Sequence, residues 1–186
     1  MSRFEITATP LAGLMLVRRL PVGDARGSLT RLFCADELRA AGWAWPVVQI
    51  NHTHTRQAGT VRGLHFQRAP HAEAKLVSCI AGEVWDVAVD LRRGSSTWLR
   101  WHALRLSANN GVALLIPPGF AHGFQALTDN VQMLYCHSHS HTPQAEGGLS
   151  VLDPALAIDW PLPVSGLSAR DAAHAPMDAH FEGIDA

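Results

Sequence analysis

The chain has 186 residues, of which 47% are hydrophobic and 17% charged, a composition typical of folded globular proteins rather than disordered ones. The formal net charge is −1, so the chain as a whole has no electrostatic attraction to nucleic acid or to a membrane surface. This length is enough to bury a substantial core and no linker divides it, so we expect a single domain over residues 1–186.

The cysteines and the N-terminus favour a cytoplasmic location. Cys34, Cys79 and Cys136 are odd in number and widely spaced, which is typical of reduced thiols rather than of a disulfide framework. The first ten residues, MSRFEITATP, lack the basic region and apolar run of a signal peptide. No apolar run approaches the ~20 residues that a membrane helix needs.

Most of the predicted elements are short strands. In chain order, we expect an apolar strand in LAGLMLV (11–17), a short helix in 35–41 ending at Gly42, and two strands in 75–91 around a turn at Ala81-Gly82. A strand follows within 96–107, and then two strand pieces in 111–127 around Pro117-Pro118-Gly119. The last elements are a strand over 131–139 and a short helix in SARDAA (168–173). The tail from Asp153 is rich in Pro, Ala and Asp, and we expect it to wrap the rest. Short strands with turn signals roughly every 8–12 residues indicate an all-β sandwich or barrel.

The segment GTVRGLHFQ (59–67) is the first candidate for chemistry. Regular strand alternation would place Arg62 and Leu64 on one face, and His65 and Gln67 on the other. Taken alone, His65 is more simply interpreted as a hydrogen-bonded histidine in a barrel wall.

The segment GVALLIPPGFAHGF (111–124) resembles the second sequence motif of the cupin superfamily, through Gly111, Pro117, Gly119 and His122. The resemblance implies an all-β, cupin-type jelly-roll barrel with a few short helices in the N-terminal third and the C-terminal tail. Many cupins bind a metal through a first motif with two histidines and a glutamate, whereas this chain has only His65 in that region. Two imidazoles alone do not make a tight divalent site, so we expect no metal.

Five ionisable residues lie in or beside these segments, and an ordinary structural interpretation is available for four of them. Lys75 would lie at a solvated strand end, Asp86 and Asp90 on an outer face, and Asp171 at a helix start; Tyr135 lies in MLYCHS.

Together these segments resemble one family. VRGLHFQ, KLVSCIAGEVWDVAVDLRRGS, LSANN, IPPGFAHGF, LY, DPALAIDWPLP and LSARDAAHAP occur in the order and spacing of the dTDP-4-dehydrorhamnose 3,5-epimerase family, from about Pro21 to Pro176. The resemblance implies epimerisation at C3 and C5 of a nucleotide-linked 4-keto-6-deoxyhexose, without a cofactor. It also implies a homodimer whose N-terminal strands are exchanged, and the apolar strand in 11–17 would need such a neighbour.

The resemblance also implies roles for individual residues. His65 matches the base, Asp171 the carboxylate that orients it, Lys75 the group near the ketone oxygen, and Tyr135 the proton donor on the other ring face. The residues implied to line the pocket or bind substrate are Arg26, Gln49, Asn51, Arg62, Asp86, His122 and Arg170, with Arg26 and Arg62 near the pyrophosphate.

Two positions depart from the family pattern. Arg31 stands where a glutamate near the nucleobase is usual, and His141 where an aromatic residue, commonly tyrosine, is found. We therefore keep a CDP- or GDP-linked ketosugar as an alternative to a dTDP sugar.

Three further alternatives remain open from the sequence. The chain could epimerise one carbon only, it could be a metal-dependent cupin such as a dioxygenase, given 11 histidines, or it could be a non-catalytic sugar-nucleotide binder. The stretch YCHSHSH bears on the second, because on a regular strand Tyr135, His137, His139 and His141 would share one face. Alternate residues lie ~6.5–7 Å apart, which is too far for adjacent imidazoles to share an ion easily, so we interpret His137 and His139 as rim residues without a role.

Overall fold

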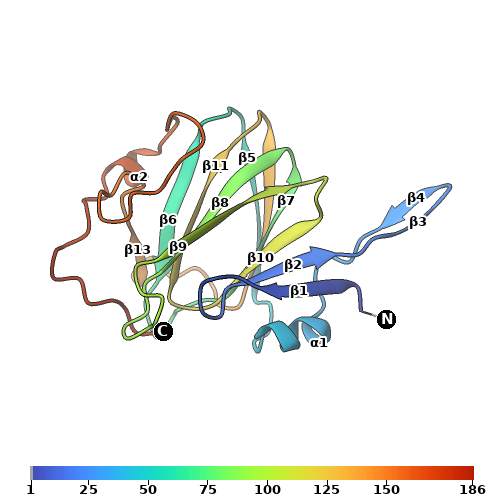
Figure 1. Cartoon of the computed structure of the whole chain (residues 1–186), viewed down its shortest axis with the longest axis horizontal. Helices are drawn as coiled ribbons and strands as arrows, with labels where there is room; N and C mark the ends of the chain where they lie inside the picture. The colour runs from blue at the N-terminus through green and yellow to red at the C-terminus, as the bar shows by residue number, and fades with distance from the viewer. Residues whose placement is uncertain (1) are drawn as a thin grey trace.

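Two antiparallel β-sheets face each other in the computed structural model, which describes residues 2–186 (Figure 1). The first sheet has the order β1-β2-β10-β7-β12-β5 and the second has the order β13-β6-β11-β8-β9. The strands are β1 (Phe4–Ala8), β2 (Met15–Arg19), β3 (Val22–Asp24), β4 (Gly27–Leu29), β5 (Gln49–Thr55), β6 (Val61–Gln67), β7 (Lys75–Ala81), β8 (Glu83–Asp90), β9 (Trp101–Ser107), β10 (Val112–Ile116), β11 (Phe120–Ala126), β12 (Val131–His137) and β13 (Glu146–Gly148). The all-β prediction is confirmed.

The turns fall where the sequence places glycine and proline. Gly82 joins β7 to β8 with φ +76°, and a Cβ there would lie 2.6 Å from the Thr128 hydroxyl. The predicted break at Pro117-Pro118-Gly119 separates β10 from β11, and Gly119 has φ +84°. Only glycine adopts such backbone angles without steric cost, which explains why the strands end at these positions.

The main core lies between the two sheets. Val77, Leu114 and Met133 of the first sheet and Ala88 and Phe124 of the second belong to one cluster of buried side chains. Each fully buried side chain of the larger kind stabilises the fold by about 1.5–3 kcal/mol relative to its exposed state.

The C-terminal tail covers the outer face of the second sheet, as expected from the sequence. Leu156 and Ile184 of the tail are buried against Val87, Val89 and Leu91 of β8 and the residue after it. In Figure 1 the tail runs down the side of β6 and β13 and carries the short helix α2 (Ala169–Ala172). Both predicted helices are present, the other being α1 (Ala35–Leu38), followed by a 3-10 turn, η1 (Arg39–Ala41), and Gly42 in the left-handed conformation.

Three expectations about strands need correction. The strand expected in 11–17 begins only at Met15, and it already has β1 and β10 of its own chain as neighbours. The strand over 131–139 ends at His137, so strand alternation does not extend to His139 and His141. Asp90 is fully buried rather than on an outer face, and hydrogen bonds from Arg92, Ser95 and Thr97 compensate the burial of its carboxylate.

Among the described residues, no helix is long and apolar enough to cross a membrane.

Candidate active site

A pocket of about 540 Å³ opens between the two sheets and is lined mainly by polar side chains. The second sheet contributes β6 and β11, the first sheet contributes β5, β7 and β12, and α2 closes one end. Eight of the residues singled out from the sequence line it: Asn51, Arg62, His65, Lys75, His122, Tyr135, Arg170 and Asp171; His141 lines its rim. These residues come from positions far apart in the chain.

His65 and Asp171 form a hydrogen-bonded pair. The His65 Nε2 lies 2.7 Å from Asp171 Oδ1, and the Asp171 side chain is only 4% exposed. Ser168 caps α2 by accepting a hydrogen bond from the Asp171 backbone N–H at 3.0 Å, which fixes the carboxylate on the first turn. Because Nε2 donates to the carboxylate, Nδ1 is the ring nitrogen that can accept a proton.

Burial and hydrogen bonding together determine the protonation state of this pair. Desolvation lowers the pKa of His65, and the opposing effect of Asp171 does not reverse the shift; the charges of Arg170 and Lys75 lower the pKa further. Burial opposes ionisation of Asp171, but the hydrogen bond and charge of His65, together with hydrogen bonds from Ser168 and the Gly63 backbone, outweigh burial, so the pKa of Asp171 lies below its usual value. The pair is therefore a neutral imidazole beside a carboxylate at neutral pH, which suits a general base.

Arg62 and His65 both face the pocket, contrary to the prediction from strand alternation. His122 pairs with His65 and Phe124 with Arg62, so two steps along β11 correspond to three along β6. Gly63, at the extra residue, packs against Gly123 so closely that a Cβ on Gly63 would lie 2.5 Å from the Gly123 Cα. This β-bulge turns Arg62 and His65 to the same side.

Lys75 enters the pocket from the first sheet. Its side chain is 9% exposed, so the interpretation as a solvated strand end is wrong. The ammonium lies 3.1 Å from a carboxylate oxygen of Glu73 and 3.5 Å from the backbone oxygen of His65. A fixed cation is thus held close to His65.

Tyr135 lies on β12, in the sheet that faces β6. Its ring packs edge-on to His122 and stacks on His137, with ring centroids 6.1 and 6.0 Å away. Burial raises the pKa of Tyr135, so the phenol stays in its proton-donating form across the physiological range.

His122 and Asp86 form a second buried pair. The His122 Nε2 lies 3.0 Å from an Asp86 oxygen, and the Asp86 side chain is fully buried. Asp86 is therefore inside the barrel, not on the outer face that its position alone suggested, because β8 is covered on both sides.

Polar groups extend from this centre to the mouth of the pocket. The Arg170 Nη1 lies 3.0 and 2.9 Å from the two carboxylate oxygens of Glu146, and its Nη2 lies 3.2 Å from the His65 Nε2. His141 is half-exposed and lies 3.4 Å from Glu146. Gln49 lies outside the pocket lining, where its side-chain oxygen accepts a hydrogen bond from the His141 backbone N–H at 3.0 Å.

Arg26 and Arg31 lie outside the pocket of their own chain. Arg26 is on the β3–β4 hairpin, which projects away from the sheets, and pairs with Asp24 (Figure 1). Arg31 pairs with Glu37 of α1.

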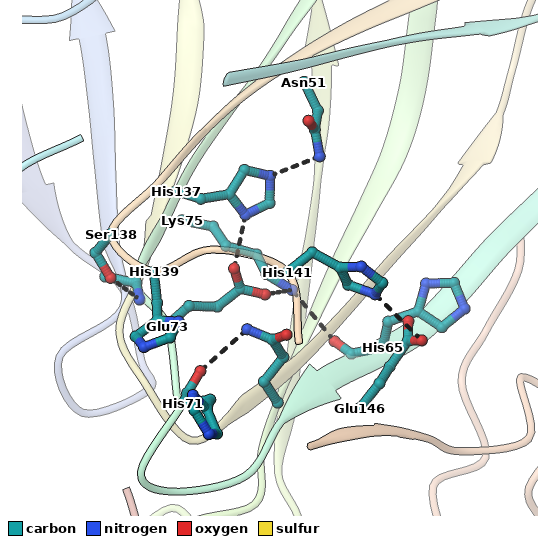
Figure 2. A network of polar contacts seen from close by, with 12 residues as sticks. Asn51, His65, His71, Glu73, Lys75, His137, Ser138, His139, His141 and Glu146 are labelled. Carbon is teal, nitrogen blue, oxygen red and sulfur yellow. Dashed lines mark hydrogen bonds and ion pairs between the residues drawn. The ribbon is translucent and has the colours of Figure 1, made fainter. Parts of the chain in front are cut away.

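Sequence reasoning missed Glu73 and misjudged His137. His137 is buried rather than at the rim, because β12 carries it into the pocket, and its Nδ1 lies 2.8 Å from Glu73 (Figure 2). The sequence offered two signals: His137 is two residues from Tyr135, and Glu73 is two residues from Lys75. His139 is at the surface as expected, with its ring beside His71.

One group of three potential metal ligands occurs among the described residues: His65, Asp171 and His174. It contains the His65–Asp171 pair, and the Arg170 guanidinium lies 3.2 Å from the His65 Nε2. A positive charge at this distance opposes the binding of a cation.

Comparison with known proteins identifies one family. Residues 8–179 match the family described as dTDP-4-dehydrorhamnose 3,5-epimerase. The enzyme of that name from Salmonella typhimurium is 37% identical over 175 residues, covering 93% of this chain and 95% of the relative.

Two solved structures have the same fold. The dTDP-4-dehydrorhamnose 3,5-epimerase from Bacillus anthracis, with TDP and PPi bound, has a TM-score of 0.90 and 34% identity, covering 94% of this chain and 99% of the other. The dTDP-6-deoxy-D-glucose-3,5-epimerase from Legionella pneumophila, in complex with dTDP-4-keto-L-rhamnose, has a TM-score of 0.89 and 37% identity, covering 97% and 98%. The predicted cupin fold is confirmed.

Proposed function

Since the chain belongs to the dTDP-4-dehydrorhamnose 3,5-epimerase family, we propose that the pocket between its sheets is where a dTDP-linked 4-keto-6-deoxyhexose is epimerised. The chain is an epimerase of dTDP-rhamnose biosynthesis. The observation that carries the assignment of the site is the placement of His65 and Tyr135 on facing sheets, with Lys75 lining the same pocket.

The chemistry requires three groups. C3 and C5 both lie next to the C4 ketone, so removing either proton produces an enolate. His65 takes the proton through Nδ1, and Asp171 stabilises the imidazolium that forms. The Lys75 ammonium stabilises the negative oxygen, as a fixed donor in a partly dry site does.

Inversion requires a proton from the opposite ring face. Tyr135 approaches from the sheet that faces His65, so a sugar ring between them has the base on one side and the phenol on the other. The raised pKa of Tyr135 keeps that proton available. Neither proton transfer requires an electron acceptor or a metal.

The arginines are suited to the pyrophosphate. Arg62 and Arg170 line the pocket, and their guanidinium groups can bind phosphate oxygens in pairs. Arg170 and His141 both contact Glu146, so His141 lies beside a proposed pyrophosphate ligand, where a nucleoside would follow the pyrophosphate. The family match favours dTDP over the CDP- and GDP-linked alternatives.

Arg26 and Arg31 fit this scheme only in a homodimer. The β3–β4 hairpin exposes Val22 and Leu29, at 43% and 68%, on an arm that leaves its own sheets. Packing of this arm on a second copy would bury both side chains and bring Arg26 to the partner's pocket.

All three cysteines are free thiols in the structure, which supports the cytoplasm as the compartment.

The proposal is tested by solvent exchange on the wild-type chain. Incubation with dTDP-4-dehydro-6-deoxyglucose in D₂O, followed by NMR, should give deuterium at C3 and C5 and an epimerised product. Calorimetry with dTDP, CDP and GDP should give the tightest binding for dTDP. A preference for CDP or GDP would instead assign the chain to a sibling activity, and deuterium at one carbon only would make it a single-centre epimerase.

A further inference from the structure

Glu73 lies between two side chains that the sheet places side by side. His137 on β12 is the direct cross-strand partner of Lys75 on β7, so both side chains point to the same face. Glu73 precedes Lys75 by two residues, and its carboxylate bridges the two groups (Figure 2). One oxygen lies 3.1 Å from the Lys75 ammonium and the other 2.8 Å from the His137 Nδ1.

All three side chains are removed from water. Glu73, Lys75 and His137 have side-chain exposures of 9, 9 and 10%. A charge in such surroundings is stable only beside an opposite charge and hydrogen-bonding partners. Glu73 is the carboxylate that meets the Lys75 ammonium, which makes it the counter-charge of that cation.

Glu73 is itself held in its ionised form. Burial acts to raise its pKa, but the hydrogen bond from His137 and the charge of Lys75 outweigh burial, so the pKa of Glu73 is lowered. The carboxylate is therefore fixed by two partners on different strands.

His137 connects this carboxylate to the rest of the wall. With Nδ1 donating to Glu73, its Nε2 accepts from the Asn51 side-chain amide on β5, at 3.4 Å. The same ring stacks on Tyr135, with an interplanar angle of 22°. One chain of contacts thus joins Asn51, His137, Glu73 and Lys75. It supports Lys75, the proposed oxyanion stabiliser, and its member His137 stacks on Tyr135, the proposed acid.

The Lys75 ammonium has three donors. One is directed to Glu73 and one to the His65 backbone oxygen, at 3.1 and 3.5 Å. The third remains for a ligand, and its direction is set by the other two.

We propose that Glu73 is a positioning residue for the epimerisation: its carboxylate aims the Lys75 ammonium into the pocket, and His137 holds that carboxylate in place. The inference rests on the proposed function, which brings Lys75 to the ketone oxygen. Glu73 itself touches no reacting atom.

The chain offers a direct test, because Lys75 is its only lysine. Protein labelled with ¹³Cε-lysine gives a single side-chain NMR signal, whose chemical shift and relaxation report the surroundings and mobility of the Lys75 side chain without any assignment. Glu73→Gln keeps the shape of Glu73 and removes its charge. We expect the Lys75 signal to move and its relaxation to show a more mobile side chain, because the ammonium loses its ion-pair partner.

The matched control is Glu83→Gln. Glu83 makes an ion pair with Arg105 outside the pocket, so its removal should leave the Lys75 signal and the activity unchanged. Circular dichroism and the unfolding midpoint establish that both variants are folded.

The kinetic readout separates positioning from binding. Glu73→Gln should lower kcat by about tenfold or more while KM stays within about threefold, since a misdirected group affects the transition state more than substrate binding. Glu73→Asp, which keeps the charge, should recover part of kcat.

Each outcome decides one of the two proposals. An unchanged Lys75 signal in Glu73→Gln overturns the inference whatever the wild-type chain catalyses, and so does a more mobile Lys75 with unchanged kcat. A more mobile Lys75 in a chain whose wild type exchanges no protons supports the Glu73–Lys75 pair and overturns the proposed function.

Discussion

The His65 imidazole can accept a proton only while it is neutral, and burial and three neighbours set the pH at which that holds. Burial lowers its pKa, Asp171 raises it, and the charges of Arg170 and Lys75 lower it again. The net shift is downward from the ordinary value of 6.5, which keeps the base unprotonated at neutral pH.

The pH profile of kcat/KM follows from these signs. As pH falls, the imidazole binds a proton and the rate drops, so the acid limb should have its midpoint below 6.5, the ordinary value. Asp171→Asn removes the group that raises the pKa, so its midpoint should move to still lower pH, together with a lower kcat. A wild-type midpoint at or above the ordinary histidine value would contradict this account of the pair.

Tyr135→Phe separates the two proton transfers. The variant loses the phenol but keeps the ring between His122 and His137, so the base remains in place. Deuterium exchange at C3 and C5 should fall less than net epimerisation, because His65 can return a proton to the face from which it came. Equal loss of both, measured by NMR in D₂O, would show that Tyr135 does not act as the opposite-face donor.

At the scale of elements, the site depends on how β6 and β11 approach each other. Gly63 and Gly123 allow backbone contact at the β-bulge that turns Arg62 and His65 to one side. A Cβ on Gly123 would lie 2.7 Å from the Arg62 backbone oxygen, so even a methyl group must displace one strand.

Gly123→Ala should therefore reduce both stability and activity. Forcing an extra methyl into a packed contact costs about 1–3 kcal/mol, and each kcal/mol lowers Tm by about 2–4 °C in a chain of this size. The displaced strand carries His122, so kcat should fall as well. An unchanged Tm in a thermal scan would mean that β6 and β11 are not held so closely.

The bulge also marks the limit of prediction from the sequence. Strand positions and turns could be predicted because glycine, proline and alternation act locally, as at Gly82 and Pro117-Pro118-Gly119. The sequence could not predict that Arg62 and His65 face the same side, because one extra residue in β6 reverses the strand alternation. The burial of Lys75 and His137 depends on Glu73, a contact that only the folded sheets create.

At the scale of the molecule, the facing sheets and the enclosing tail bring most of the candidate residues into one pocket, with Arg26, Arg31 and Gln49 outside its lining. His65 comes from the second sheet, Tyr135 and Lys75 from the first, and Asp171 from the tail. The family resemblance supplied the roles, while the pairing of His65 with Asp171 at 2.7 Å supplies the geometry that those roles require.

The projecting hairpin predicts how the chain assembles. Val22→Glu with Leu29→Glu places two charges where the proposed homodimer buries apolar side chains, so sedimentation should show a shift from dimer to monomer. Leu152→Glu, at a side chain 64% exposed in another region, is the control and should leave the dimer intact. A wild-type chain that is monomeric at assay concentrations would remove the partner role of Arg26.

The central claim is that His65 removes the protons at C3 and C5. The most direct measurement is deuterium incorporation from D₂O into dTDP-4-dehydro-6-deoxyglucose by His65→Asn, compared with the wild type under the same conditions. A folded His65→Asn chain should incorporate no deuterium at either carbon, whereas wild type should label both. Near-normal exchange by the variant would contradict the assignment of His65 as the base.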